Sequence, residues 1–226
     1  RGQIMSIWSD AMGIVTAAFS GDSWTLSSAL KTEGAWIVGT ICTVIGGYLM
    51  MRLYRAVPFF DRHLERSIMV YSYLLIAAII FVEVFRRFVL SQQAPWSTTL
   101  PPVLFLIMTW FGCSYNIRLR THLAFSEFRS AMSRPMQMVC LSLDAVLWMG
   151  FCIIVVVTST RVAANSAANF QILAGTDNFM QWWYLVLVPV AFVLMAGRVL
   201  ENWTDDLANF RNGNPLINQA VIGGDT

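Results

Sequence analysis

The chain has 226 residues, of which 57% are hydrophobic and only 12% are charged. A soluble domain carries roughly 25% charged residues, and even an unusually apolar one needs a polar shell. The composition therefore argues against a soluble globular protein, and the net charge of +2 is too small to indicate a nucleic-acid partner.

Before the first long apolar run, apolar residues recur at helical spacing. Ile4, Ile7, Trp8, Ala11, Met12, Val15 and Phe19 form one side, opposite Ser6, Asp10 and Thr16. The pattern favours an amphipathic helix lying on the membrane surface. The polar side lacks Lys and Arg, which is equally typical of a flexible, partly helical terminus, so both alternatives stay open.

Five long apolar runs are candidate transmembrane helices. In chain order they are Trp36–Leu53, Ser67–Phe85, Val103–Ile117, Met136–Val157 and Trp182–Leu200. Each is near the ~20 residues that a helix needs to cross ~30 Å of hydrocarbon, although the third is short. Pro101 and Pro102 suit the first turn of that third helix, and Ser159–Phe179 is read as a long polar connection. The sequence predicts an all-α integral membrane protein with about five transmembrane helices.

The positions of Arg and Lys predict the orientation, because cytoplasmic loops retain positive charge. One side holds Arg52, Arg55, Arg62, Arg66, Arg118, Arg120, Arg129, Arg134, Arg198 and Arg211. The other side holds only Arg1, Lys31, Arg86, Arg87 and Arg161. The amino terminus is therefore expected outside and the carboxyl terminus in the cytoplasm. If Trp36–Leu53 instead lay in the interface, four spans would remain and the amino terminus would be inside.

Ionisable residues within the spans are the candidates for chemistry, because burying them in hydrocarbon is costly. Glu83 stands three and four residues before Arg86 and Arg87, which favours an ion pair near the outer interface over a proton relay. Asp144 lies about two turns into the fourth span. It is expected to face protein, with Asn116, a loop arginine or another subunit as its partner.

The sequence lacks the signatures of an enzyme. The histidines, His63 and His122, lie outside the spans, which disfavours haem. No GxSxG, HExxH, Walker A or GxGxxG motif occurs. Four cysteines fall within apolar runs without metal-ligand spacing, namely Cys42, Cys113, Cys140 and Cys152. We therefore predict no catalytic residue, no metal site and no cofactor.

A family resemblance appears in GCSYNIRLRTHLAFS, which starts at Gly112. With Arg118 and with His122 ten residues after the glycine, it resembles the DctQ-type small permease subunit of tripartite ATP-independent periplasmic (TRAP) transporters. Arg87-Phe-Val and the later Pro-Trp pair ending at Trp96 resemble the outer end of the preceding helix in that family. The resemblance covers residues 60–203, and an extra apolar segment precedes the four helices typical of the family.

The apolar patterns predict an interfacial segment (1–34) and an extra transmembrane helix with a basic loop (35–60). The resemblance implies a DctQ-like four-helix membrane domain (61–203), followed by a cytoplasmic tail (204–226). It implies a multi-pass protein of the bacterial inner membrane. This subunit would brace a large elevator-type permease subunit during sodium-coupled uptake of an organic acid, C4-dicarboxylates by default, which a periplasmic binding protein delivers.

The resemblance also implies interface residues. Arg118, Arg120 and His122 are expected at the cytoplasmic interface, where they would bind anionic phospholipid headgroups or loops of the large subunit. Gly112 permits close helix packing, either with the partner or within the chain.

At the outer end, Arg87 and Trp96, together with the Ser159–Phe179 connection, are candidate contacts for the binding protein. Two hypotheses from other classes remain at this stage: a free-standing structural or assembly protein of the membrane, and a membrane anchor or accessory subunit of a redox enzyme.

The orientation can be tested by cysteine labelling. In a chain whose native cysteines are replaced by alanine, a cysteine placed near Asp22 is expected to react with an impermeant maleimide added from outside, because the arginine-rich side stays in the cytoplasm. Labelling only from the cytoplasmic side would contradict the predicted external amino terminus.

Overall fold

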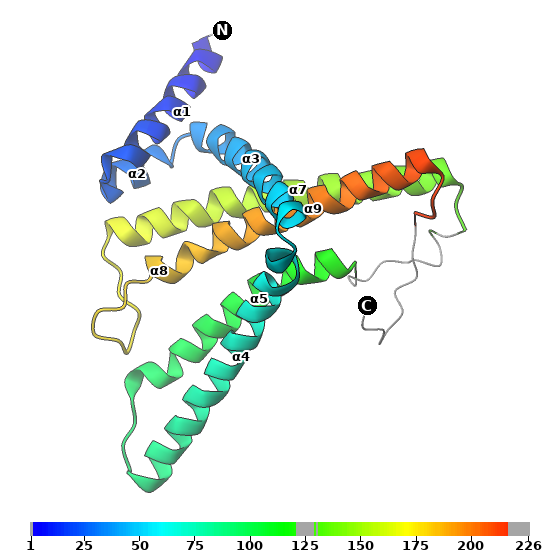
Figure 1. The fold of residues 1–226 in the computed structure, drawn as a ribbon. Coiled ribbons are helices and arrows are strands. Elements are labelled where there is room, and N and C mark those ends of the chain that lie inside the picture. The colour runs from blue at the N-terminus through cyan, green and yellow to red at the C-terminus, as the bar shows by residue number, and fades with distance from the viewer. Residues whose placement is uncertain (1, 121–128, 130, 217–226) are drawn as a thin grey trace.

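A computed structural model describes residues 2–120, 129 and 131–216. Its helices are α1 (Gly2–Ser20), α2 (Ser23–Ala29), α3 (Gly34–Ala56), α4 (Pro58–Val89), η1 (Pro95–Thr98), α5 (Leu100–Leu119), α7 (Arg134–Ala168), α8 (Trp182–Leu185) and α9 (Leu187–Asn212) (Figure 1). Five helical segments are long and apolar enough to cross a membrane: Gly34–Ala56, Pro58–Val89, Pro95–Leu119, Arg134–Ala168 and Trp182–Asn212. The prediction of an all-α membrane protein with five such helices is confirmed.

Prolines set where three of these helices begin. Pro101 and Pro102 lie in the first turn of α5, as predicted, and Pro58 and Pro135 have the same position in α4 and α7. The first turn is where a missing amide hydrogen costs nothing. Only Val57 separates α3 from α4, so the basic residues expected in a loop there lie on the two helices instead.

The predicted connection Ser159–Phe179 is wrong over its first ten residues, because α7 continues to Ala168. The hydroxyl groups of Thr158, Ser159 and Thr160 donate to carbonyl oxygens four residues earlier in the same helix. These polar side chains are thus satisfied within the helix, and the alanines that follow favour helix. Residues 169–181 alone form the turn back to α8 and α9.

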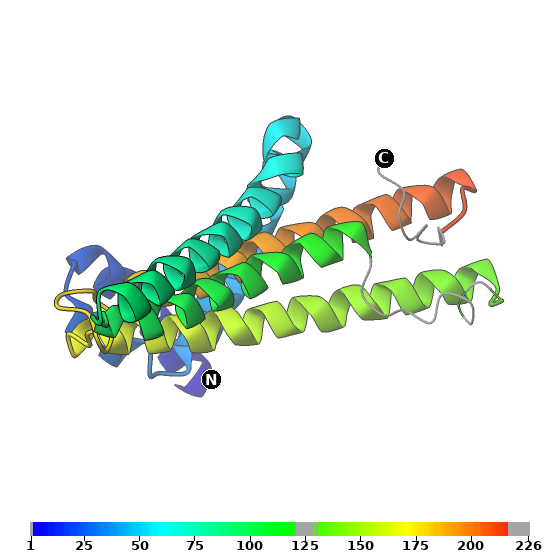
Figure 2. The same cartoon turned by 90° about the horizontal axis from the view of Figure 1, so that it is seen from below.

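Helix α9 is the central element of the bundle. It packs against α3, α5 and α7, and α4 packs against α5 (Figures 1 and 2). Half of the apolar segment of α9 is buried, compared with 6% for α4 and 11% for α7. The core therefore follows α9, while α4 is mostly exposed and α7 is mostly half-buried, with few residues of either helix fully enclosed.

The backbones of α3 and α9 come close together at two glycines. A Cβ atom on Gly47 would lie 3.1 Å from Cβ of Ala196, and one on Gly197 would lie 3.0 Å from Cβ of Met50. Thr43, one turn before Gly47, is completely buried. Small residues at this spacing let two helices approach closely, so this contact joins the extra helix to the bundle.

The amino-terminal segment is helical, as the prediction of an amphipathic helix requires. Helix α1 packs on α3 and α2 packs on α7. Ala11 and Ile14 are buried in these contacts, whereas Trp8, Met12 and Phe19 are exposed. The apolar residues of α1 are thus divided between the chain and its surroundings, and the location of α1 on the membrane surface remains a prediction.

The close approach at Gly47 can be tested by adding bulk. Gly47→Leu is expected to lower the free energy of unfolding by about 1–3 kcal/mol, because the new side chain would meet the α9 backbone. Denaturant unfolding in mixed micelles would measure the change. Gly150→Leu is the matched control, since a Cβ there meets nothing within 4 Å. Equal effects of the two substitutions would contradict a packing role for Gly47.

Candidate functional site: an ion network joining four helices

A completely buried arginine lies at the centre of the bundle. Nε and Nη2 of Arg198 on α9 donate to the two carboxylate oxygens of Glu65 on α4, each at 3.1 Å. Nη1 donates to the carboxylates of Asp61 and Glu201, and Nη2 also donates to the carbonyl oxygen of Asp61. All five N–H groups of this guanidinium therefore have an acceptor.

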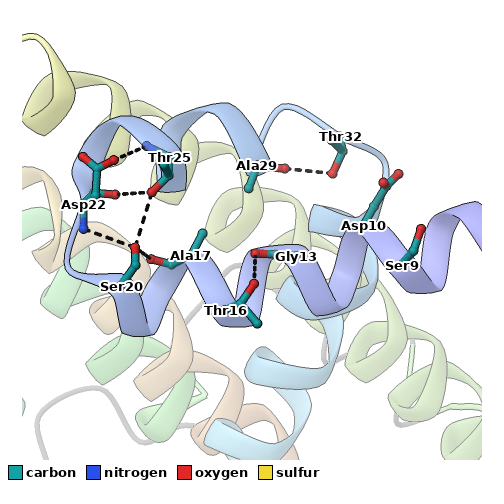
Figure 3. Close-up of a pocket in the computed structure, with 10 residues that line it drawn as sticks. All are labelled: Ser9, Asp10, Gly13, Thr16, Ala17, Ser20, Asp22, Thr25, Ala29 and Thr32. Carbon is teal, nitrogen blue, oxygen red and sulfur yellow. Dashed lines mark hydrogen bonds between the residues drawn. The ribbon is translucent and has the colours of Figure 1, made fainter.

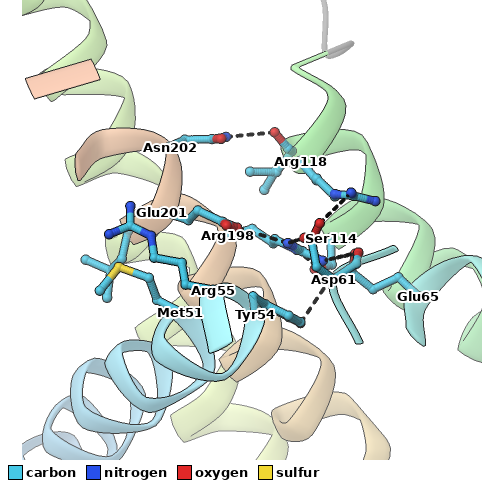
Figure 4. Close-up of polar contacts among 12 residues, drawn as sticks. Met51, Tyr54, Arg55, Asp61, Glu65, Ser114, Arg118, Arg198, Glu201 and Asn202 are labelled. Carbon is cyan, nitrogen blue, oxygen red and sulfur yellow. Dashed lines mark hydrogen bonds and ion pairs between the residues drawn. The ribbon is translucent and has the colours of Figure 1, made fainter. Parts of the chain in front are cut away.

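Two more helices reach the same point (Figure 4). The hydroxyl of Ser114 on α5 donates to Oε1 of Glu65 at 2.6 Å, and the hydroxyl of Tyr54 on α3 donates to the same oxygen at 3.2 Å. The guanidinium carbon of Arg198 lies 3.6 Å from the centre of the Tyr54 ring, in a cation–π contact. Helices α3, α4, α5 and α9 are thus held together by one group of side chains.

Arg118 on α5 extends the group by pairing with Oδ2 of Asp61 at 2.7 Å. We call the set the Arg198 network: Tyr54, Asp61, Glu65, Ser114, Arg118, Arg198 and Glu201. A buried ion pair adds little net stability, because desolvation offsets the attraction. Removing Arg198 is costly, since it leaves Glu65 buried without a counter-charge. The network therefore fixes how the helices are arranged more than it adds to their stability.

A second set of contacts fastens the end of α5 to α9. Nη1 of Arg120 pairs with Asp206 at 2.7 Å, and Nη2 donates to the carbonyl oxygen of Asn202. The amide of Asn202 in turn donates to the carbonyl oxygen of Ile117 at 2.8 Å. This last contact satisfies a carbonyl of the final turn of α5, where helical partners run out.

Further arginines tie α7 to its neighbours. Nη1 and Nη2 of Arg134 donate to the carbonyl oxygens of Gly213 and Asn214, which closes the carboxyl end of α9. Arg129 pairs with Asp144 of α7 at 2.6 Å. The partner of Asp144 is therefore a loop arginine, one of the alternatives that the sequence left open.

At the other end of the bundle, the expected pairing of Glu83 with Arg86 or Arg87 is wrong, because no such ion pair forms among the described residues. The chain turns after α4 and brings the amide of Ala94 to Oε1 of Glu83, at 3.3 Å. Oε2 of Glu83 is buried and has no hydrogen-bond partner among the described groups. Close by, the hydroxyl of Thr99 donates to the carbonyl oxygen of Ala174, which holds the 169–181 turn against η1.

Figure 3 shows an open groove between α1 and α2. Its lining comprises Ser9, Asp10, Gly13, Thr16, Ala17, Ser20, Asp22, Thr25, Ala29 and Thr32. The hydroxyls of Ser9, Thr16 and Ser20 donate to carbonyls of their own helix, and Asp22 caps α2. The polar atoms of the groove are thus mainly acceptors, the rest of its lining is apolar, and it shares no residue with the Arg198 network.

Within the described part of the chain, the interface residues predicted from the sequence lie at opposite ends of the bundle. Arg118 lies within the Arg198 network and Arg120 beside it, while Gly112 is buried against Met69 of α4. Arg87 and Trp96 lie near the opposite end of α4, away from that network. His122 lies outside the described residues. The proposed contacts of all these residues with partners or lipid stay predictions.

Sequence reasoning missed most of the Arg198 network. Asp61 and Glu65 stand four residues apart, as do Ser114 and Arg118, so each pair shares one helix face. Arg198 falls within the apolar run that ends at Leu200, although the count of positive charges alone assigns it to the cytoplasmic side. The sequence does contain a signal for this site: a charged residue inside an apolar run, Arg198, together with the Asp61/Glu65 and Ser114/Arg118 pairs on other predicted helices.

The architecture and this site define a polytopic membrane protein whose described polar core is built for holding helices together. A family model described as "Tripartite ATP-independent periplasmic transporters, DctQ component" matches residues 76–209. Because the match covers more than half of the chain, this protein belongs to the DctQ family, the small permease component of TRAP transporters. A comparison with curated proteins finds no match.

The matched range contains Ser114, Arg118, Arg198 and Glu201, but it begins after Tyr54, Asp61 and Glu65. The Arg198 network therefore joins the family region to α3 and to the first half of α4, which precede it. Arg55 reinforces this junction by pairing with Asp205 of α9 at 2.7 Å.

Arg198→Ala is expected to lower the free energy of unfolding by about 3–5 kcal/mol, because it leaves the buried carboxylate of Glu65 without a counter-charge. Unfolding in mixed micelles would measure it. Arg55→Ala is the control, because that exposed pair joins two of the same helices and is worth at most about 1 kcal/mol. A loss at Arg198 no larger than that at Arg55 would show that the network is not what holds the helices.

Proposed function

We propose that this chain is a stationary brace for the large permease subunit of a TRAP transporter in a bacterial inner membrane. The large subunit would carry an organic acid across the bilayer in sodium-coupled uptake, after a periplasmic binding protein delivers it. C4-dicarboxylates are the default substrate class, from the family resemblance. The chain itself would bind neither sodium nor substrate and would perform no catalysis.

The observation that carries this proposal is the Arg198 network. Four helices meet at one guanidinium whose five N–H groups all have acceptors. Sliding one helix past another would separate buried charges, which is costly. Such a bundle suits a part that holds its position while a neighbouring subunit moves.

The outward apolar surfaces of α4 and α7 give further support. Phe81 and Phe88 on α4 are exposed by 75% and 79%, and Val146 on α7 by 67%. Lipid or another membrane subunit must cover surfaces of this kind. Apolar surfaces on two helices allow one part of the bundle to contact lipid and another to contact the large subunit, as a brace anchored in the bilayer requires.

The first experiment is purification of the chain from its native membrane in mild detergent, with mass spectrometry of the proteins that accompany it. Recovery of a large polytopic permease is the expected result. Recovery of the chain by itself, or with redox subunits, would overturn the bracing function.

Transport kinetics then separate a brace from a substrate-binding part. In vesicles with all three components, Arg118→Ala is expected to lower the maximal uptake rate without changing the half-saturating substrate or sodium concentration, because it loosens α5 from α4. Arg211→Ala, which removes an exposed cation near the end of α9, is the control. A changed half-saturating concentration with Arg118→Ala would place this chain at the transport site, contrary to the proposal.

A further inference from the structure

Helix α4 is longer than the bilayer core requires. Its 32 residues span about 48 Å, against about 30 Å of hydrocarbon. The apolar part begins near Ser67. The first nine residues therefore extend about 13 Å beyond the hydrocarbon, through a headgroup layer that is roughly 5–8 Å thick on each side.

This extension has two sides of opposite charge. Asp61 and Glu65 point inward to Arg198. Arg62 and Arg66, one turn apart on another side, are exposed. Carboxylates thus face the protein, and guanidinium groups face the surroundings at the depth of the lipid headgroups.

Five acidic residues of the described chain at this end are already engaged. Asp61, Glu65 and Glu201 pair with Arg198, while Asp205 and Asp206 pair with other arginines. Among the described residues, Arg62 and Arg66 form no ion pair. Two like charges at this spacing repel each other, so an anion from outside the described chain would relieve the repulsion.

The same side of α4 carries aromatic and apolar groups above and below the two arginines. Toward the helix start, the ring of His63 stacks on Phe59 with centres 4.9 Å apart, and Phe59 is 67% exposed. Toward the hydrocarbon, Val70 and Tyr73 follow at helical spacing and are also exposed. The ring of His63 lies at the depth of the headgroups and Phe59 just beyond them, whereas Val70 and Tyr73 lie at the depth of the acyl chains.

We propose that Arg62 and Arg66 bind the phosphate of an anionic phospholipid, whose acyl chains lie along Val70 and Tyr73. The planar guanidinium fork matches phosphate oxygens in pairs. The continuous strip from cations to apolar groups along one helix side favours a lipid over an acidic protein. This goes beyond the bracing function and does not depend on it.

The arginines that meet lipid are then different from those expected from the sequence. Arg118 and Arg120 were the sequence candidates, but Asp61 and Asp206 neutralise them within the chain. Arg62 and Arg66 keep their charges available at the same end of the bundle.

Native mass spectrometry of the full chain in neutral detergent, titrated with phosphatidylglycerol or phosphatidylcholine, tests this site. Wild-type protein is expected to bind phosphatidylglycerol more tightly. Arg62→Gln with Arg66→Gln is expected to weaken that binding by about fivefold for each arginine, and to weaken phosphatidylcholine binding less, because choline already neutralises the phosphate of that lipid. Circular dichroism would check that the exposed substitutions leave the helices intact.

Lys31→Gln with Arg211→Gln removes the same charge from exposed positions elsewhere and is expected to change the Kd less than twofold. Arg62→Lys with Arg66→Lys is expected to give an intermediate Kd, because charge remains but the fork is lost. The proposal is overturned by an equal loss in the Lys31 and Arg211 control, by an unchanged Kd in the Gln variant, or by displacement of the lipid with soluble glycerol phosphate. Equal wild-type binding of both lipids, as a site for an acidic protein would give, also overturns it.

Discussion

The arrangement of this bundle depends on the burial of one positive charge. Arg198 has no exposed surface, so each of its N–H groups needs an acceptor within the protein. Those acceptors come from α4 and from α9 itself, and Ser114 and Tyr54 complete the coordination of Glu65. The positions of four helices follow from satisfying this one side chain.

The close contact between α3 and α9 positions residues of the Arg198 network. Gly197 precedes Arg198 directly, and Gly47 stands two turns before Tyr54 on α3. Where the glycines let the two backbones meet, the following residues carry the Tyr54 ring over the guanidinium. Packing of small residues and pairing of charges are therefore parts of one junction, which ties the additional helix to the region that the DctQ family shares.

Much of the fold could be predicted from local patterns. Apolar runs identified the five long helices, and Pro101 and Pro102 marked a helix start, because these signals act over one or two turns. The extent of α7 was underestimated, since Ser and Thr read as loop residues until their hydroxyls are seen bonding to their own helix. The Arg198 network was beyond such reasoning, because its main contacts join residues 133–137 positions apart, and pairing over that distance requires the fold.

That separation has a consequence for biogenesis. Membrane proteins are made from the amino terminus, so Asp61, Glu65 and Arg118 emerge long before Arg198. Before α9 is inserted, Asp61 can pair with Arg118. Glu65 then has only the hydroxyl groups of Ser114 and Tyr54 as donors. Insertion of the last helix thus supplies the missing charge, so the carboxylate of Glu65 gains its counter-ion only when α9 has joined the bundle.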